Sequence, residues 1–224
     1  LVGSEMCIRD RIRPAITRLL QTQMKNDDLS LRYGRSKSNS KNDIVINPSI
    51  LVNTISKTNL DRDEVMIGTV VHEAIHATNN YTLDPESINK LFPEELDDVE
   101  DIDDILEILT GPFGKYVFDI LIHSIEEKIF VKQYEGLNSI LEDIYTESFS
   151  EIKKLSNFSQ YLSLLFHSIT SYIDPEFENY KKPVVSSLNE SLHILKTLNY
   201  EDVNVSELID ATVQMVDILS LIHI

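Results

Sequence analysis

Apolar residues recur every three or four positions through most of the chain, which is the spacing of helices with one buried face. The first such segment covers residues 13–25, with Ile16, Leu19 and Leu20 on one side. In the second half of the chain the same spacing predicts four consecutive helices, over residues 140–155, 158–173, 183–198 and 206–218. The chain is therefore expected to be rich in helix.

The period changes after the first segment. Leu29, Leu31 and Tyr33 alternate with polar residues, and a short apolar run at residues 44–46 follows a polar loop. Alternation with a period of two is typical of a strand with one buried face. We expect a hairpin or another pair of strands in this region.

A longer helix should begin near Arg62. Asp61 and Glu64 have the spacing of a capping box. In this motif each of the two side chains accepts a hydrogen bond from the backbone N–H of the other residue. The apolar pattern continues to the pair at residues 79–80, where two asparagines are a plausible helix stop.

Two further helices precede the C-terminal series. Residues 93–109 are strongly acidic but keep an apolar stripe at helical spacing, which favours a solvated amphipathic helix over a calcium loop, since the glycine of an EF-hand is absent. Residues 114–136 are apolar around most of the helix, which predicts a buried helix that ends near Gly136.

These elements indicate an α+β fold that is predominantly α-helical. We expect a small N-terminal strand pair packed on the helix that begins near Arg62, followed by a helical C-terminal half. A single domain is predicted over residues 12–218, with the strand pair and candidate site at about residues 29–136 and a helical extension at about residues 137–218.

Both ends of the sequence differ in character from the rest. Residues 1–11 (LVGSEMCIRDR) and 219–224 (LSLIHI) resemble translated sequencing-adapter read-through, so we expect them to lie outside the natural protein. The alternative is a genuine helix start and a genuine C-terminal strand. Cys7, the one cysteine, falls in the first of these segments, so the sequence gives no support for disulfides or thiolate chemistry.

The net charge of −17 limits the kinds of partner that the protein is expected to bind. Binding of a phosphate backbone needs clustered Lys and Arg, so nucleic acid is not an expected partner. The same charge would be repelled by an anionic membrane surface, and no apolar run reaches the roughly 20 residues that cross a bilayer. We therefore expect a soluble protein.

The strongest chemical pattern is His72-Glu73-Ala74-Ile75-His76 inside a predicted helix. Residues four apart share a helical face, so both imidazoles can bind one zinc ion at about 2.0–2.1 Å. Glu73 can then take a proton from a metal-bound water as the nucleophile forms. The alternative is a pair of histidines, in solvent or in the core, that bind no metal.

A catalytic zinc usually has three protein ligands. Glu126 is the better candidate for the third, because a carboxylate in the buried helix is costly unless a partner neutralises it. Glu127 is the competing choice. His123 precedes both and could orient a ligand, donate a hydrogen bond in the transition state or be a core histidine, while His167 and His193 are read as core or surface positions.

HEAIH, followed about fifty residues later by HSIEEKIF, resembles the gluzincin-type zincins, whose third ligand is a glutamate on a following helix. The succession DIVINPSIL, HEAIH, HSIEEKIF and YEGLNSIL, over about residues 29–141, is similar to metallopeptidases of bacteriophages and bacteria that are often joined to a von Willebrand factor A-like domain. Those relatives carry N-x-I-E-D-x-R at the second motif. Glu126 matches its glutamate, whereas His123, Glu127 and Ile129 replace Asn, Asp and Arg.

The resemblance implies a zinc metallopeptidase in the cytoplasm of a bacterium or phage-infected cell. It implies a peptide or protein substrate, Zn2+ held by His72, His76 and Glu126, Glu73 as the general base, and a von Willebrand factor A-like domain in a longer protein. Two alternatives remain: an inactive zincin-like structural or adaptor domain, and a metal-free helical interaction module that uses the acidic residues 97–107.

Overall fold

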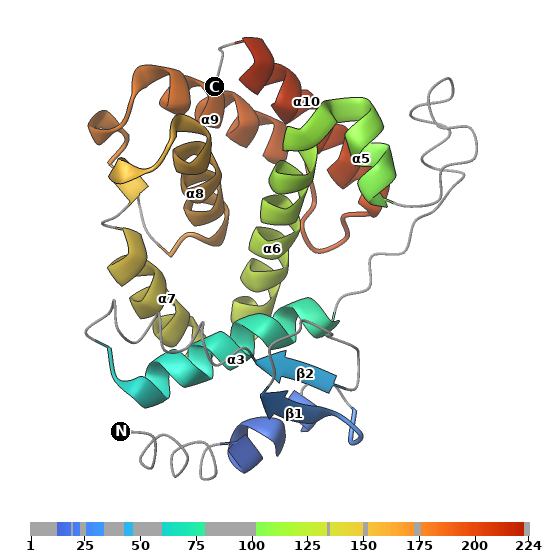
Figure 1. Ribbon diagram of the computed structural model, residues 1–224, viewed down its shortest axis with the longest axis vertical. Coiled ribbons are helices and arrows are strands. Elements are labelled where there is room, and N and C mark those ends of the chain that lie inside the picture. The colour runs from blue at the N-terminus through green and yellow to red at the C-terminus, as the bar shows by residue number, and fades with distance from the viewer. Residues whose placement is uncertain are drawn as a thin grey trace. The chain divides into compact units, whose positions relative to one another are not determined.

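The computed structural model describes residues 13–18, 20–22, 26–33, 43–46, 60–78, 102–133, 135–149, 152–172 and 176–221. These ranges are mostly helical and contain one two-stranded sheet (Figure 1). The strands are β1 (Ser30–Tyr33) and β2 (Asp43–Ile46), and the longer helices are α3 (Arg62–Thr78), α5 (Ile102–Thr110), α6 (Gly114–Gln133), α7 (Glu135–Phe149), α8 (Asn157–Thr170), α9 (Lys182–Leu195) and α10 (Val205–Leu221). The predicted class, a predominantly α-helical α+β fold, is confirmed.

Contacts divide the chain into two compact units. Unit 1 is Leu1–Asn80 with Phe130–Ser148, and unit 2 is Tyr81–Ile129 with Phe149–Ile224. Each unit is therefore built from two separate stretches of chain, and the second division falls within α6. The single domain over residues 12–218 stays a prediction, and residues 1–11 lie outside the described residues.

The strands of unit 1 pair in parallel, with Ser30 opposite Asp43 and Tyr33 opposite Ile46. The hairpin, one of the two expected arrangements, is therefore wrong. Alternation predicts which face of a strand is buried, but it does not predict the strand's direction. The intervening residues 34–42 could span roughly 30 Å when extended, which is long enough to bring the chain back to the same end of the sheet.

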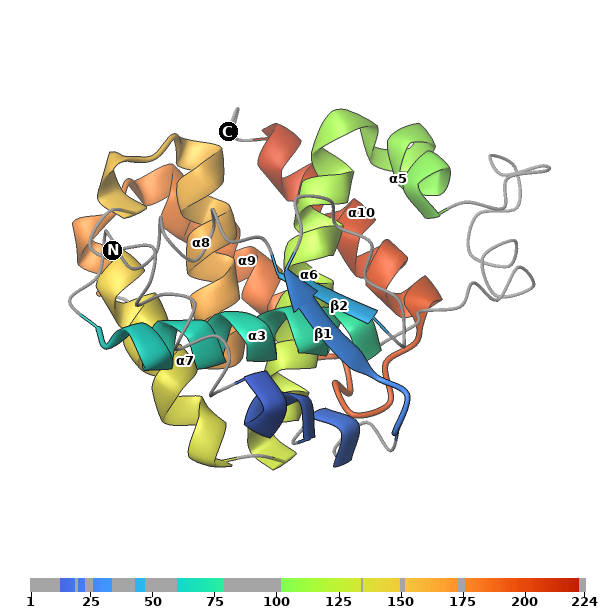
Figure 2. The same cartoon turned by 60° about the horizontal axis from the view of Figure 1, so that its bottom comes forward.

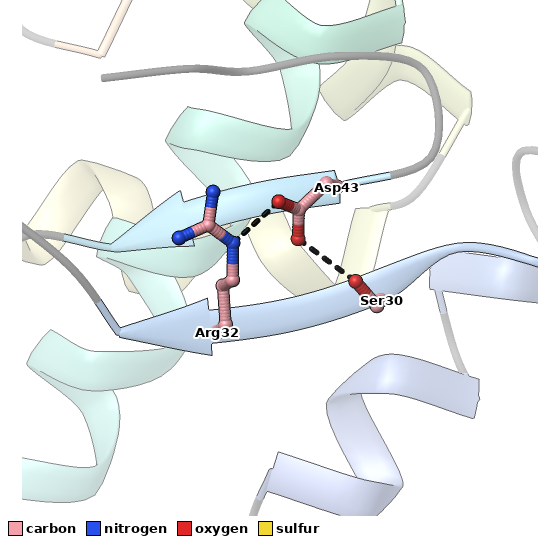
Figure 3. A network of polar contacts seen from close by, with 3 residues as sticks. All are labelled: Ser30, Arg32 and Asp43. Carbon is pink, nitrogen blue, oxygen red and sulfur yellow. Dashed lines mark hydrogen bonds and ion pairs between the residues drawn. The ribbon is translucent and has the colours of Figure 1, made fainter. Parts of the chain in front are cut away.

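A polar network holds this register at the start of the pair (Figure 3). The Ser30 hydroxyl donates to Asp43 Oδ1 at 2.8 Å, and the Arg32 guanidinium forms an ion pair with Asp43 Oδ2. These hydrogen bonds, first from Arg32 and then from Ser30, lower the pKa of the Asp43 carboxyl. All three residues lie on the two strands, so the contacts favour pairing of Ser30 with Asp43 over a shifted register.

Helix α3 begins as the capping box predicts. The Asp61 carboxylate accepts the N–H of Asp63 at 2.8 Å, and the Glu64 carboxylate accepts the N–H of Asp61 at 3.3 Å. These bonds satisfy N–H groups that the first turn of a helix leaves without an intrahelical acceptor. The asparagines expected to stop the helix lie outside the described residues.

The core of unit 1 joins the strands to the first half of α3. The main cluster of buried residues comes from the first helical segment, the residue before β1, both strands and α3, and consists of Ile16, Leu20, Leu29, Leu31, Ile44, Met66 and Val70. Two of the three alternating positions, Leu29 and Leu31, are buried, with 2% and 1% of their surface exposed, and the side chain of Tyr33 lies outside the described residues. Successive residues of a strand point to opposite faces, so Arg32 lies on the face opposite Leu31, which is the polar face of the strand pair.

Unit 2 is a cluster of helices around one apolar core. Helix α9 packs against α8 and α10, and α10 also contacts α5. The core includes one or more fully buried side chains from each of these helices and from α6, among them Leu106, Leu121, Tyr161, Leu188 and Leu208. The tyrosine is accommodated because its hydroxyl forms a 2.7 Å hydrogen bond with Ser191.

Several predicted helix ends are shifted. Gly136 was expected to end the buried helix, but α6 ends at Gln133 and Gly136 lies in the first turn of α7. Helix α8 ends at Thr170, before the predicted residue 173, because Ser171 adopts a left-handed conformation with φ 64°. Of the acidic helix expected over residues 93–109, the described part begins at Ile102.

Candidate metal centre

The HEAIH motif lies in the second half of α3. The helix spans residues 62–78, so the backbones of His72 and His76 are one turn apart on the same helical face, as predicted. The side chain of His76 lies outside the described residues. The side chains of His72 and Glu73, the other two polar members of the motif, are described.

The His72 ring is half-buried and has a partner on another helix of unit 1. Its Nδ1 lies 3.2 Å from the hydroxyl oxygen of Tyr145, on α7. If Nδ1 carries the proton and donates it to this oxygen, the ring lone pair is on Nε2, the form in which an imidazole can bind a metal through that nitrogen. Sequence reasoning missed Tyr145.

Glu73 is buried, with 7% of its surface exposed. Val70, Val71 and Ile75, its neighbours in the helix, are exposed to 1% or less. An ionised carboxylate in such surroundings loses hydration and therefore requires compensating interactions. Glu73 is thus a buried carboxylate that directly follows His72 on the same helix.

Helix α7 lies beside α3 (Figures 1 and 2), and the two helices approach closely at Gly68, one turn before His72. A Cβ placed on Gly68 would lie 2.3 Å from Ile144 Cδ1 and 3.3 Å from Ile140 Cγ2. The absence of a side chain at Gly68 therefore allows α7 to pack where it does. Ile144 adjoins Tyr145, so the same packing places the hydroxyl that contacts His72.

Glu126 and Glu127, the two candidates for the third ligand, both lie on α6 in unit 2 and are buried to 3% and 0% exposure. Glu127 Oε1 accepts a 2.9 Å hydrogen bond from the hydroxyl of Tyr172, which is itself buried. The burial of Glu127 is thus compensated in part within unit 2. Tyr172 is a second residue that sequence reasoning missed.

The other histidines in the described part of the chain occupy different environments. His123 is half-buried on α6, and its expected orienting role stays a prediction. His193 is exposed on α9, whereas His167 is a core residue of α8 with 4% exposure. Its ring makes edge contacts with Phe149 and Phe166 at centroid distances of 4.9 and 5.4 Å, and burial lowers the pKa of His167 to about 4.

Among the described side chains, no group of three or more His, Cys, Asp and Glu is arranged to hold a metal ion. The expected set of His72, His76 and Glu126 includes a side chain that is not described, so this set stays a prediction.

No helix in the described part of the chain is both long and apolar enough to cross a membrane.

Comparison with known proteins adds no relative. No protein-family model, curated protein or solved structure matches the chain. The resemblance to gluzincin-type zincins therefore rests on the motifs of the sequence, and the chemistry of the candidate centre rests on the environments of His72, Glu73 and their neighbours.

Proposed function

We propose that the chain is a zinc-dependent metallopeptidase-like protein that hydrolyses peptide bonds. His72, His76 and Glu126 would hold Zn2+, and Glu73 would be the general base. The observation that carries the proposal is that a single helix presents a buried glutamate beside a histidine whose Nδ1 contacts Tyr145. A buried carboxylate and an imidazole with a partner at Nδ1 both suit metal-assisted hydrolysis. The two residues, Glu73 and His72, are adjacent in the HEAIH motif.

The donor set fits zinc. Neutral imidazole nitrogens and a carboxylate oxygen are common ligands of catalytic zinc, which keeps one coordination position for water or substrate. The contact of His72 Nδ1 with Tyr145 is the kind of outer interaction that orients a metal-binding imidazole. Glu126 is buried, and a bound metal ion would offset the loss of hydration of a carboxylate in that position.

Glu126 is preferred over Glu127 because it matches the glutamate of the N-x-I-E-D-x-R motif, in which Glu127 replaces an aspartate. The Tyr172 hydroxyl donates to Glu127 Oε1, and this contact lies inside unit 2. Consecutive residues of a helix also project about 100° apart, so the two carboxylates face different surroundings. Glu127 would then support the fold around α6, and Glu126 would bind the ion.

In the proposed reaction, bound zinc would polarise the scissile carbonyl and make water more acidic. Glu73 accepts one proton as the water oxygen forms a bond to the carbonyl carbon. The C–N bond then breaks, and Glu73 returns that proton to the leaving amine nitrogen.

The remaining parts of the proposal come from the sequence. The architecture would be one domain over residues 12–218, in which the strand pair packs on the motif helix and supports it. A peptide or protein is the proposed substrate, and a von Willebrand factor A-like domain is the proposed partner in a longer protein. The proposed location is the cytoplasm of a bacterium or phage-infected cell.

Zinc content and hydrolysis of a mixed peptide library test the proposal together. The wild-type chain should bind one zinc per molecule, Glu73→Gln should keep the metal and lose hydrolysis, and His72→Ala should lose both. His193→Ala removes an exposed histidine and serves as the control. Full hydrolysis by Glu73→Gln would refute the assigned base, whereas zinc without any hydrolysis in the wild type would favour the structural or adaptor domain.

A second pair of variants tests the third ligand. Glu126→Gln should weaken zinc binding by more than about 100-fold, because a direct ligand contributes more than the outer residues that support it. Glu127→Gln is the matched control, since the amide oxygen can still accept the Tyr172 hydroxyl proton. The reverse order of the two affinities would move the ligand to Glu127.

A further inference from the structure

We propose that Tyr145 is a positioning residue for the candidate metal centre. Its hydroxyl oxygen would accept the Nδ1 proton of His72 and so keep the lone pair of this imidazole on Nε2, where the metal binds. The inference rests on the proposed function, because it concerns a ligand of the proposed zinc ion. It adds a residue of α7 to a centre that the sequence places on α3 and α6.

The contact joins residues that are 73 positions apart in the chain. Tyr145 Oη and His72 Nδ1 are 3.2 Å apart, at the long end of the hydrogen-bond range, and both side chains are half-buried. Both residues belong to unit 1, so the contact lies within one compact unit. It is not a product of neighbouring positions on a single helix.

The chemistry of imidazole gives the contact a consequence. A neutral ring has one N–H and one lone pair, and only the form with the proton on Nδ1 leaves Nε2 able to bind a metal. A phenol hydroxyl can either accept that proton or donate to the other form. Zinc on Nε2 removes the second possibility, so metal binding selects the arrangement in which Tyr145 accepts.

Packing between α3 and α7 provides a second, independent observation. The close approach at Gly68 sets the position of Ile140 and Ile144 against α3, one turn before His72. Ile144 precedes Tyr145, and Leu141, one turn earlier on α7, is buried to 1% exposure. The hydroxyl is thus carried by a helix that is anchored by its own apolar contacts, which do not need the tyrosine oxygen.

This anchoring makes Tyr145→Phe a suitable probe. The variant removes one oxygen and keeps the ring, so we expect folding and only a small shift of the urea midpoint. Tyr116→Phe is the matched control, because Tyr116 is an exposed tyrosine of α6, with 57% of its surface accessible. Zinc affinity of the full chain is measured by competition with a chromophoric chelator.

The expected result is that Tyr145→Phe binds zinc about tenfold more weakly, at the lower end of the loss seen when residues that orient a ligand are changed. Tyr116→Phe should bind as tightly as the wild type. A structural role for Tyr145 alone would lower the urea midpoint of the metal-free chain and leave the affinity of the folded protein unchanged.

A readout without metal completes the test. In chains labelled with nitrogen-15 histidine, the shifts of the two ring nitrogens report which one carries the proton at about pH 8. Tyr145→Phe should change this distribution for His72, and Tyr116→Phe should not. Unchanged affinity together with an unchanged distribution would overturn the role of Tyr145 while zinc binding by the wild type still supported the proposed function. A wild-type chain that binds no zinc would instead overturn both.

Discussion

Acid should destabilise unit 2 through His167. This ring lies in the last turn of α8, is 4% exposed and has Phe149 and Phe166 as ring neighbours. Burial favours its neutral form and lowers its pKa from 6.5 to about 4. The C-terminal end of a helix favours a positive charge by about 0.3–1 kcal/mol, which is too little to offset burial of this extent.

The sign and the pH window follow from these values. The unfolded chain takes up a proton near pH 6.5, whereas the folded chain does so only near pH 4. The contribution of His167 to stability is therefore fully present above pH 6.5 and is lost as the pH falls toward 4. Between about pH 8 and pH 5 this linkage reduces the free energy of unfolding by about 2 kcal/mol.

Urea unfolding at several pH values, followed by circular dichroism, measures this loss. Other groups also titrate in acid, so the relevant quantity is the difference in slope between the wild type and His167→Leu. We expect the variant to lose about 2 kcal/mol less than the wild type over the same pH interval. His193→Leu removes an exposed histidine of the same unit and is the control.

Equal pH slopes for the wild type and His167→Leu would refute this reasoning, whatever the absolute stability of the variant. An equally reduced slope in both variants would also refute it, because the effect would then not depend on burial. A lower stability of His167→Leu at all pH values would reflect the changed packing and would leave the slope as the test.

Three further substitutions test the packing and polar contacts. Gly68→Ala adds a methyl group that would overlap the terminal Cδ1 of Ile144. The overlap costs about 1–3 kcal/mol and the helix preference of alanine offsets about 1 kcal/mol, so we expect the free energy of unfolding to fall by no more than about 2 kcal/mol. Combining it with Ile144→Val should recover part of the overlap cost, and additive effects in the double variant would disprove the overlap. Tyr172→Phe should lower the free energy of unfolding by about 2 kcal/mol, because it removes a hydrogen-bond donor from the buried carboxylate of Glu127. A loss below about 0.5 kcal/mol would show that this hydrogen bond contributes little to stability. Lys128→Met should lower the midpoint temperature of thermal unfolding. The substitution removes the 2.8 Å hydrogen bond from the Lys128 ammonium group to the Ile169 carbonyl, near the C-terminal end of α8. An unchanged midpoint would contradict the idea that Lys128 caps this helix end.

Local patterns predicted the helices well. The capping pair Asp61 and Glu64 located the start of α3, because its bonds join residues two and three positions apart. Helical spacing also found α8, α9 and α10. Their ends were less predictable, since the left-handed conformation of Ser171 carries no glycine or proline to mark it.

Long-range pairing was less accessible to sequence reasoning. The parallel direction of the strands depends on how the chain returns between them, and alternation contains no such information. Likewise, the contact of His72 with Tyr145 and that of Glu127 with Tyr172 join residues 73 and 45 positions apart. The sequence motifs identified His72 and Glu127 as candidate residues. Their tyrosine partners, Tyr145 and Tyr172, are brought to them by the packing of α7 and of the segment after α8.

The interleaved path of the chain has a consequence for its synthesis. Unit 1 needs Phe130–Ser148 in addition to Leu1–Asn80, so α3 cannot gain its contacts with α7 until the ribosome has made all of unit 2's first stretch, Tyr81–Ile129. A nascent chain paused before residue 130 would therefore expose the face of α3 around Gly68. Chaperone binding during translation should concentrate in that interval.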